Sequence, residues 1–314
     1  MPTEAGPTNR RRRPHLPSLR QSIAVNEHDV DCGGLRLSVR DRAGGSPAIL
    51  ALHGLASNAR WWDLVGARLS PQWRVLAPDL RGHGRSDKPD SGYSFPEIVE
   101  DLRGLCATEG LDRVIVAGHS WGASVALWFA AALPERVLGC VCVDGGAGDL
   151  RAHISGGWAE AEERMRPPAF TGLTEAGVRA WVASGPLAQS GDARTAADMV
   201  LGNFEGDTDG TLRPRLRLHR HMEIARQLYE LDSFELMGQV RCPVLFLPAR
   251  DPQAAWAPAA KMEALERARA VLGERAAVVW IDGVHDLPVQ RPAEVAGAIA
   301  EFSVGLATRL FHPD

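Results

Sequence analysis

The sequence predicts an α/β fold in which a mostly parallel sheet is flanked by helices and interrupted by an inserted helical region. Short apolar runs alternate with longer amphipathic runs through residues 28–146, and the alternation returns at Pro243 after a more polar stretch. Strands that alternate with helices are typical of βαβ units, which form parallel sheets. We therefore expect a sheet domain made of two segments, 21–146 and 239–314, around a helical cap at 147–238.

The expected strands are short and apolar, as strands are when helices cover both faces of a sheet. They lie at residues 48–52, 75–77, 114–117, 137–143, 243–247 and 277–281. Residues 35–39 alternate apolar and polar side chains, which predicts a half-exposed strand at the edge of the sheet.

The expected helices show apolar side chains at three- and four-residue steps. Phe95, Ile98 and Leu102 follow this spacing, which places them on one buried face of a helix. The sheet domain is expected to contain helices at 58–69, 95–109, 121–133, 257–272 and 291–306. The cap is expected to contain helices at 157–166, 174–183, 193–203 and 217–230.

Composition narrows the possible partners. The chain has 314 residues, of which 45% are apolar and 24% charged, as in ordinary globular proteins. The formal net charge of −4 does not favour binding to a polyanion, so we expect no nucleic-acid partner. The sequence has no glycine loop for a dinucleotide or a phosphate and no HExxH motif. We expect neither a cofactor nor a metal.

The arginine run Arg10–Arg13 lies in an N-terminal segment without the apolar stretch of a secretory signal, so residues 1–20 are predicted to form a disordered basic arm. No apolar run approaches the roughly 20 residues that cross a bilayer. The cysteines are odd in number, and we expect Cys140 and Cys142 to point apart and to remain unpaired. Reduced thiols favour a cytoplasmic location.

The pentapeptide Gly118-His119-Ser120-Trp121-Gly122 lies between an expected strand and an expected helix. A nucleophilic serine needs an exposed hydroxyl on a tight strand-to-helix turn, and small flanking residues admit the strained backbone of such a turn. The two glycines meet this requirement, so we predict that Ser120 is a nucleophile. A serine that caps a helix is the alternative interpretation of this pattern.

Two further segments complete a resemblance to a known family. His53-Gly54-Leu55 follows the expected strand at 48–52, and Pro78-Asp79-Leu80-Arg81-Gly82-His83-Gly84-Arg85-Ser86 follows the strand at 75–77. Together with the serine turn, they resemble the α/β-hydrolase family over about residues 28–306. The resemblance implies an eight-stranded, mostly parallel sheet with an inserted helical cap. It also implies an oxyanion hole formed by the backbone amides of Leu55 and Trp121.

His285 lies in the loop after the last expected strand and resembles the family's catalytic histidine, since the base follows the nucleophile and the acid in this fold. Asp251, which follows the strand at 243–247, is expected to orient the imidazole and stabilise its cation. Asp144, which follows the strand at 137–143, is the alternative acid in a position that some relatives use. His119 is expected to point away from Ser120.

The residues expected to bind substrate come from the oxyanion turn and the helix that follows it. Gly54 lets the backbone approach the substrate beside His53, and Trp61 and Trp62 are candidates to line an acyl pocket. Packing of at least one of these tryptophans against the sheet is the alternative. We expect a small hydrophobic acyl substrate.

These observations predict a serine hydrolase of carboxylic esters, lactones or thioesters. Ser120 argues against epoxide hydrolases and haloalkane dehalogenases, whose relatives use aspartate there, and the turn lacks the HGGPG sequence of proline aminopeptidases. A hydrolase of carbon–carbon bonds beside a ketone would use the same oxyanion hole. The fold would also be compatible with a non-enzymatic receptor for a small ligand or with an incidental cofactor-free peroxidase activity.

Overall fold

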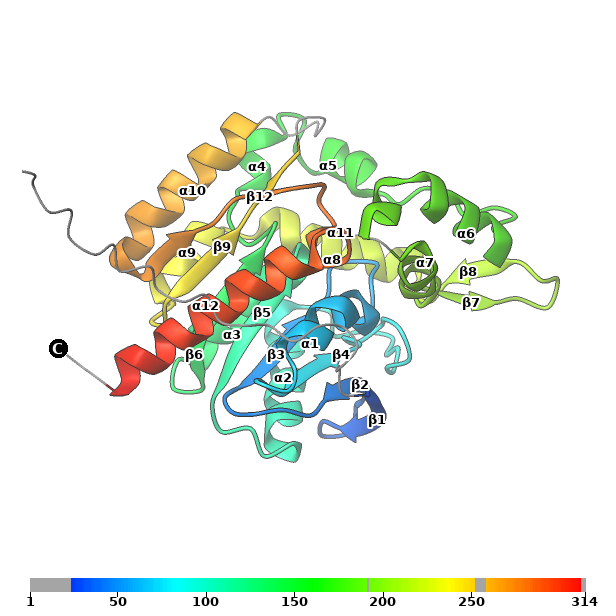
Figure 1. The fold of residues 1–314 in the computed structure, drawn as a ribbon. Helices are drawn as coiled ribbons and strands as arrows, with labels where there is room; N and C mark the ends of the chain where they lie inside the picture. Colours follow the sequence, from blue (N-terminus) through cyan, green and yellow to red (C-terminus); the bar gives the residue numbers. More distant parts are fainter. Residues whose placement is uncertain (1–23, 191, 252–257, 312–314) are drawn as a thin grey trace, which may run out of the picture.

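A computed structural model describes residues 24–311 except residue 191 and residues 252–257 (Figure 1). The basic arm expected at residues 1–20 lies outside the described residues. No helix in the described ranges is both long and apolar enough to cross a membrane.

The core of the fold is an eight-stranded sheet with the order β1-β2-β4-β3-β5-β6-β9-β11. The strands β1 and β2 are antiparallel to each other, β2 is antiparallel to β4, and the remaining neighbours are parallel. This sheet confirms the expected fold class. The strands are β1 (Asn26–Asp31), β2 (Arg36–Arg42), β3 (Ala48–Leu52), β4 (Val75–Pro78), β5 (Val114–His119), β6 (Val137–Val143), β9 (Val244–Leu247) and β11 (Ala276–Val278).

The edge of the sheet differs from the sequence prediction. The expected edge strand, β2, is covered by β1, which pairs with it from Asn26↔Asp41 to Asp31↔Arg36. In β1 only Val30 is buried, so the strand has little of the apolar alternation by which a strand is detected. At the other end of the sheet, the expected strand 277–281 is divided between β11 and β12 (Ile281–Asp282), and β12 pairs with β10 (Ala249–Arg250).

Helices cover both faces of the sheet, because alternate strand residues feed two separate apolar clusters. Leu50 and Val116 belong to one cluster, and Ile49 and Ile115 belong to the other. The first cluster is completed by α2 (Phe95–Thr108), α3 (Trp121–Ala132), α9 (Ser233–Gln239) and α10 (Pro258–Leu272). The second is completed by η2 (Ala59–Trp62), α1 (Asp63–Leu69), α11 (Leu287–Gln290) and α12 (Pro292–Phe311).

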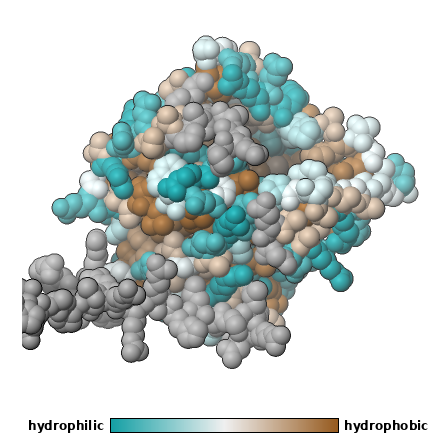
Figure 2. Space-filling model, turned by 45° about the horizontal axis from the view of Figure 1, so that its top comes forward, coloured by the Kyte–Doolittle hydropathy of each residue, from teal (hydrophilic) through white to brown (hydrophobic). Residues whose placement is uncertain are grey.

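The segment between β6 and α9 is mainly helical and gathers to one side of the sheet (Figure 1). It also contains a short antiparallel hairpin that periodicity did not predict, because each of its strands has only three residues. Figure 2 shows one face of the molecule, on which apolar and polar side chains are intermixed. The elements of the segment are α4 (Leu150–His153), α5 (Gly157–Met165), α6 (Glu175–Ser184), η3 (Pro186–Ser190), α7 (Ala193–Leu201), β7 (Phe204–Gly206), β8 (Leu212–Pro214) and α8 (Leu218–Glu230).

All five cysteines are free thiols. The expectation that Cys140 and Cys142 point apart is wrong, because residues two positions apart on a strand share a face. Their sulfur atoms lie 3.9 Å apart on the same side of β6.

Candidate active site

Ser120 forms the turn between β5 and α3 with a left-handed backbone, φ 55° and ψ −123°. Such a conformation is costly for a residue with a Cβ and persists only where the surroundings enforce it. The Ser120 amide donates to the carbonyl of Val143, 2.9 Å away. A Cβ at Gly118 would lie 2.0 Å from the Gly122 oxygen, and one at Gly122 would lie 2.4 Å from the His53 oxygen. The flanking glycines therefore permit the turn.

His285 joins this serine to a carboxylate. Its Nε2 lies 2.9 Å from the Ser120 hydroxyl oxygen, and its Nδ1 lies 2.6 Å from Oδ2 of Asp144. With the Nδ1–H group donating to the carboxylate, Nε2 is free to accept the serine proton. The geometry can therefore move a proton from Ser120 to His285 while Asp144 holds the imidazole in the required tautomer.

The structure corrects the expected acid, because His285 contacts Asp144 rather than Asp251. Asp144 follows β6, which is the direct neighbour of β5 and so ends beside the Ser120 turn. Asp251 follows β10, a short strand beyond the end of β9. In the sheet, β9 lies one strand farther from β5 than β6 does. The backbone of Asp144 is also left-handed, with φ 41°, as expected for a side chain that the fold holds in a special orientation.

The Asp144 carboxylate is buried, with only 3% of its side chain exposed, and its second oxygen has two donors. Oδ1 accepts the Ala249 amide at 2.8 Å and the Lys261 ammonium at 2.6 Å. Burial alone would raise the pKa of Asp144, but the bonds and charges of His285 and Lys261 outweigh it and lower that pKa to about 2. Burial would lower the pKa of His285, yet Asp144 raises it above the ordinary value.

The buried ring of His53 fixes the backbone of the turn His53-Gly54-Leu55. The Leu80 amide donates to His53 Nε2 at 3.0 Å, so Nδ1 carries the proton and donates to the Gly54 carbonyl at 2.8 Å. Carbonyl and N–H of one trans peptide point in opposite directions, so the Leu55 amide is turned away from His53. Within the described part of the chain, neither Leu55 N–H nor Trp121 N–H has an acceptor. Both are available for an oxyanion.

A cavity of about 960 Å³ opens at Ser120 and His285. Gly54 and Trp61 line it, whereas His53 and Trp62 do not. His53 is fully buried behind the turn, and Trp62 packs into the apolar cluster with 2% of its surface exposed. The other apolar lining residues come mostly from the segment between β6 and α9, and they include Pro167, Pro168, Phe170, Leu173, Val178, Trp181, Leu187, Val200, Phe204, Leu216 and Leu218.

His119 belongs to the site, contrary to the expectation that it points away. Its Nε2 donates to the His285 carbonyl at 2.9 Å, and the two rings are centred 4.9 Å apart. Burial is the main reason that the pKa of His119 falls to about 4, so the ring is neutral at physiological pH. Sequence reasoning also missed Lys261, for which the only signal is that lysine is rare in this chain.

A family model described as the alpha/beta hydrolase fold matches residues 47–175, which include the oxyanion turn and the serine turn. The crystal structure of E-2-(acetamidomethylene)succinate hydrolase aligns with 89% of this chain and 99% of its own, with a TM-score of 0.74 and 27% identity. The chain has the α/β-hydrolase fold.

Several known proteins are similar to this chain in sequence. The 2-(acetamidomethylene)succinate hydrolase of Mesorhizobium japonicum is 38% identical over 37% of this chain and 41% of its own. An uncharacterized protein of Mycobacterium tuberculosis is 41% identical over 33% of this chain and 30% of its own. Epoxide hydrolase A of the same organism is 27% identical over 91% of this chain and 99% of its own. The chain thus matches less than half the length of the two more identical relatives.

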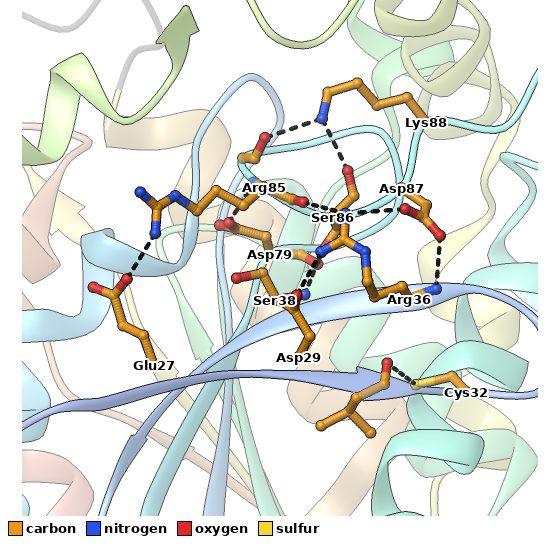
Figure 3. A network of polar contacts seen from close by, with 12 residues as sticks. Glu27, Asp29, Cys32, Arg36, Ser38, Asp79, Arg85, Ser86, Asp87 and Lys88 are labelled. Atoms are coloured by element: carbon orange, nitrogen blue, oxygen red, sulfur yellow. Dashed lines mark hydrogen bonds and ion pairs between the residues drawn. The ribbon is translucent and has the colours of Figure 1, made fainter.

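The segment Pro78–Ser86 acts as a scaffold in this fold (Figure 3). Asp79 accepts the amides of Ala59 and Arg85, each at 2.7 Å, and the Ser86 hydroxyl accepts the Ser38 amide at 2.8 Å. These bonds connect β2, the start of η2 and the loop after β4. The segment therefore holds together the elements beside the cavity, which His83 and Gly84 line. Among the described residues, no three His, Cys, Asp or Glu side chains are grouped as metal ligands would be.

Proposed function

We propose that this chain is a serine hydrolase that cleaves a carboxylic ester or a related acyl bond, such as a lactone or thioester. The observation that carries the proposal is the unbroken series of contacts from Ser120 through His285 to Asp144, at the mouth of a large and mainly apolar cavity. The site residues are assigned accordingly, with Ser120 as nucleophile, His285 as base and Asp144 as acid.

The reaction begins when His285 Nε2 takes the Ser120 proton and the serine oxygen attacks the acyl carbon. The carbonyl oxygen becomes an oxyanion that accepts from the Leu55 and Trp121 amides. His285 then gives its proton to the leaving oxygen or sulfur, and an ester bond remains between Ser120 and the acyl group. Water attacks this ester after losing a proton to His285, and the acid leaves as Ser120 recovers its proton. Asp144 stabilises the imidazolium at each step.

Serine chemistry separates this proposal from the epoxide hydrolases among the relatives. A serine oxygen that opened an epoxide would form an alkyl ether, which the oxyanion hole and a water molecule cannot cleave. An acyl-serine ester, in contrast, is hydrolysed by the same groups that formed it. The enzyme is therefore expected to act on acyl compounds and not on epoxides.

The cavity favours a hydrophobic substrate of moderate or large size. Pockets of about 300–1,000 Å³ hold drug-sized ligands, and this cavity of about 960 Å³ is at the upper end. A series of p-nitrophenyl esters of increasing acyl length is expected to show kcat/KM rising beyond acetate. A parallel series of lactones, thioesters and 1,3-diketones distinguishes the ester proposal from carbon–carbon bond hydrolysis.

The decisive variant is Ser120→Ala. We expect it to lower kcat for p-nitrophenyl esters by about a thousandfold or more, since the covalent step is lost. It is also expected to abolish labelling by a fluorophosphonate. Ser91→Ala, at an exposed serine, controls for the loss of a hydroxyl and is expected to keep full activity. Undiminished turnover by Ser120→Ala would overturn the proposal, and labelling of the wild type without turnover of any acyl substrate would favour a receptor.

A further inference from the structure

A lysine side chain continues the series of contacts beyond the carboxylate. Lys261, in the first turn of α10, places its ammonium 2.6 Å from Asp144 Oδ1 and 3.2 Å from the Ala249 carbonyl oxygen. The other carboxylate oxygen accepts from His285. Lys261, Asp144, His285 and Ser120 therefore form one continuous line of hydrogen bonds.

The surroundings of this pair are poorly screened by water. Asp144 has 3% and Lys261 has 27% of its side chain exposed. A cavity of about 80 Å³ lies beside them, and its walls include the apolar side chains of Cys142, Phe246 and Leu265. Because charges interact more strongly where the local dielectric is low, the ammonium influences the imidazole across the carboxylate.

We propose that Lys261 is a positioning residue that sets the pH at which His285 becomes a base, by drawing the negative charge of Asp144 away from the imidazole. Lys261 does not reach Ser120 and acts only through Asp144. When the lysine shares the carboxylate, Asp144 stabilises the imidazolium less, and His285 releases its proton at a lower pH. The inference rests on the proposed serine-hydrolase function, for which His285 must be neutral before Ser120 attacks the substrate.

Two carboxylates near His285 shift its pKa in the direction opposite to that of Lys261. Burial lowers the pKa of His285, the bond and charge of Asp144 raise it, and the charge of Asp286 raises it further. The Lys261 ammonium opposes both carboxylates and lowers that pKa. His119, from the end of β5, donates to the His285 carbonyl and is itself neutral. Lys261 is thus a cation that opposes two acids at His285, whose pKa stays above its ordinary value.

The identity of the side chain supports a role for a compact charge. Among the 35 lysine and arginine residues, only Lys88 and Lys261 are lysines. The surface ion pairs of the described chain are accordingly made by arginine, as Arg250 does with Asp282. An ammonium is a point charge suited to one carboxylate oxygen, whereas a guanidinium favours a two-oxygen fork. At Asp144, Oδ2 already contacts His285, so a lysine that contacts Oδ1 alone fits this position.

The test compares Lys261→Met with the wild-type enzyme in the pH dependence of kcat/KM for a p-nitrophenyl ester. Loss of the ammonium is expected to move the midpoint of the acidic limb to higher pH, so that kcat/KM falls several-fold on that limb and little at the alkaline plateau. Lys261→Arg keeps the charge and is expected to retain a midpoint near that of the wild type. Arg250→Gln removes a solvated cation from neighbouring β10 and is expected to shift nothing.

A uniform loss of kcat/KM at all pH values in Lys261→Met, with the wild-type midpoint, would overturn the inference and leave a purely structural ion pair. A midpoint that moved to lower pH would overturn it as well. The titration of the His285 ring by NMR, in a Ser120→Ala background, provides a readout that does not need turnover and is expected to move upward with Lys261→Met. A wild-type enzyme without turnover or fluorophosphonate labelling would contradict the proposed function, while this titration would still test the lysine.

Discussion

At the scale of single residues, the choice between two aspartates decides how the base is supported. Asp144 bonds His285 Nδ1 at 2.6 Å, whereas Asp251 follows a strand that is farther from the nucleophile. Asp144→Asn would keep the shape of the side chain but remove the charge that holds the imidazole tautomer. We expect kcat to fall by about a thousandfold to ten-thousandfold. Steady-state assays of Asp144→Asn and Asp251→Asn provide the measurement.

Asp251→Asn is the matched control, because it makes the same chemical change one strand away. It is expected to keep kcat near the wild-type value, since the contact between His285 and Asp144 persists. The reverse ranking of the two variants would show that the acid is Asp251.

Sequence reasoning could select Ser120 and His285, whose side chains the structure places 2.9 Å apart, but could not decide between the two aspartates. Glycines around Ser120 are a local requirement of the turn, and the place of His285 follows from chain order. The choice between Asp144 and Asp251 depends instead on which strand lies next to β5 in space. That order, β5-β6-β9, results from pairing between distant segments and has no signal in either aspartate's neighbourhood. Lys261 was missed for the same reason, since α10 meets Asp144 only through tertiary packing.

At the scale of elements, a buried histidine holds the turn after β3, in which the proposed oxyanion hole has one of its two amides. His53 connects the Leu80 amide to the Gly54 carbonyl and thereby fixes the direction of the Leu55 amide. His53→Ala would leave the buried Leu80 amide without its partner, at a cost of about 1–3 kcal/mol. The Gly54 carbonyl would keep only the Ser57 amide, 3.2 Å away, so this peptide would be held less firmly. We expect kcat to fall by about a hundredfold, as for the loss of one oxyanion donor, with a smaller change in KM.

His53→Asn provides a partial rescue, because its amide can donate to one backbone group and accept from another over a shorter reach. It is expected to lie between the wild type and His53→Ala in kcat and in the urea midpoint of unfolding. A normal kcat in His53→Ala would contradict the positioning role, even if the variant were less stable.

The elements that sequence patterns predict best are those buried on both sides. The expected strand 48–52 coincides with β3, and the expected helix 95–109 differs from α2 by one residue. The elements that were missed carry few apolar residues, as in β1 with Asn26, Glu27 and Asp29, or are very short, as in the hairpin of β7 and β8. Such strands are stabilised by their neighbours in the sheet and not by a pattern of their own.

At the scale of the whole molecule, buried neutral histidines lie behind and beside the candidate site. His53 and His83 are fully buried, and His119 has 2% of its surface exposed. Burial is the main cause that lowers the pKa values of His53 and His119 to about 4 and that of His83 to about 3. Their rings contact one another, Trp121 or His285, with His53 and His83 centred 4.8 Å apart. Protonation of these histidines therefore links the stability of the fold to pH.

This linkage predicts a loss of stability in mild acid. In the unfolded chain these histidines gain protons below their ordinary pKa of 6.5, whereas in the folded chain they stay neutral down to about pH 4. The unfolded state then binds more protons, so the free energy of unfolding falls by up to about 1.4 kcal/mol per pH unit for each buried histidine. His285 has the opposite sign, since its raised pKa adds stability below its ordinary value, and it therefore works against this decrease. Urea midpoints measured from pH 7.5 to 4.5 are expected to decrease steeply below about pH 6.5.

His83→Gln is expected to flatten that decrease, while His219→Gln, at an exposed histidine of α8, is expected to leave it unchanged. A urea midpoint that stayed constant between pH 7 and 5 would show that these rings are already protonated in the folded protein.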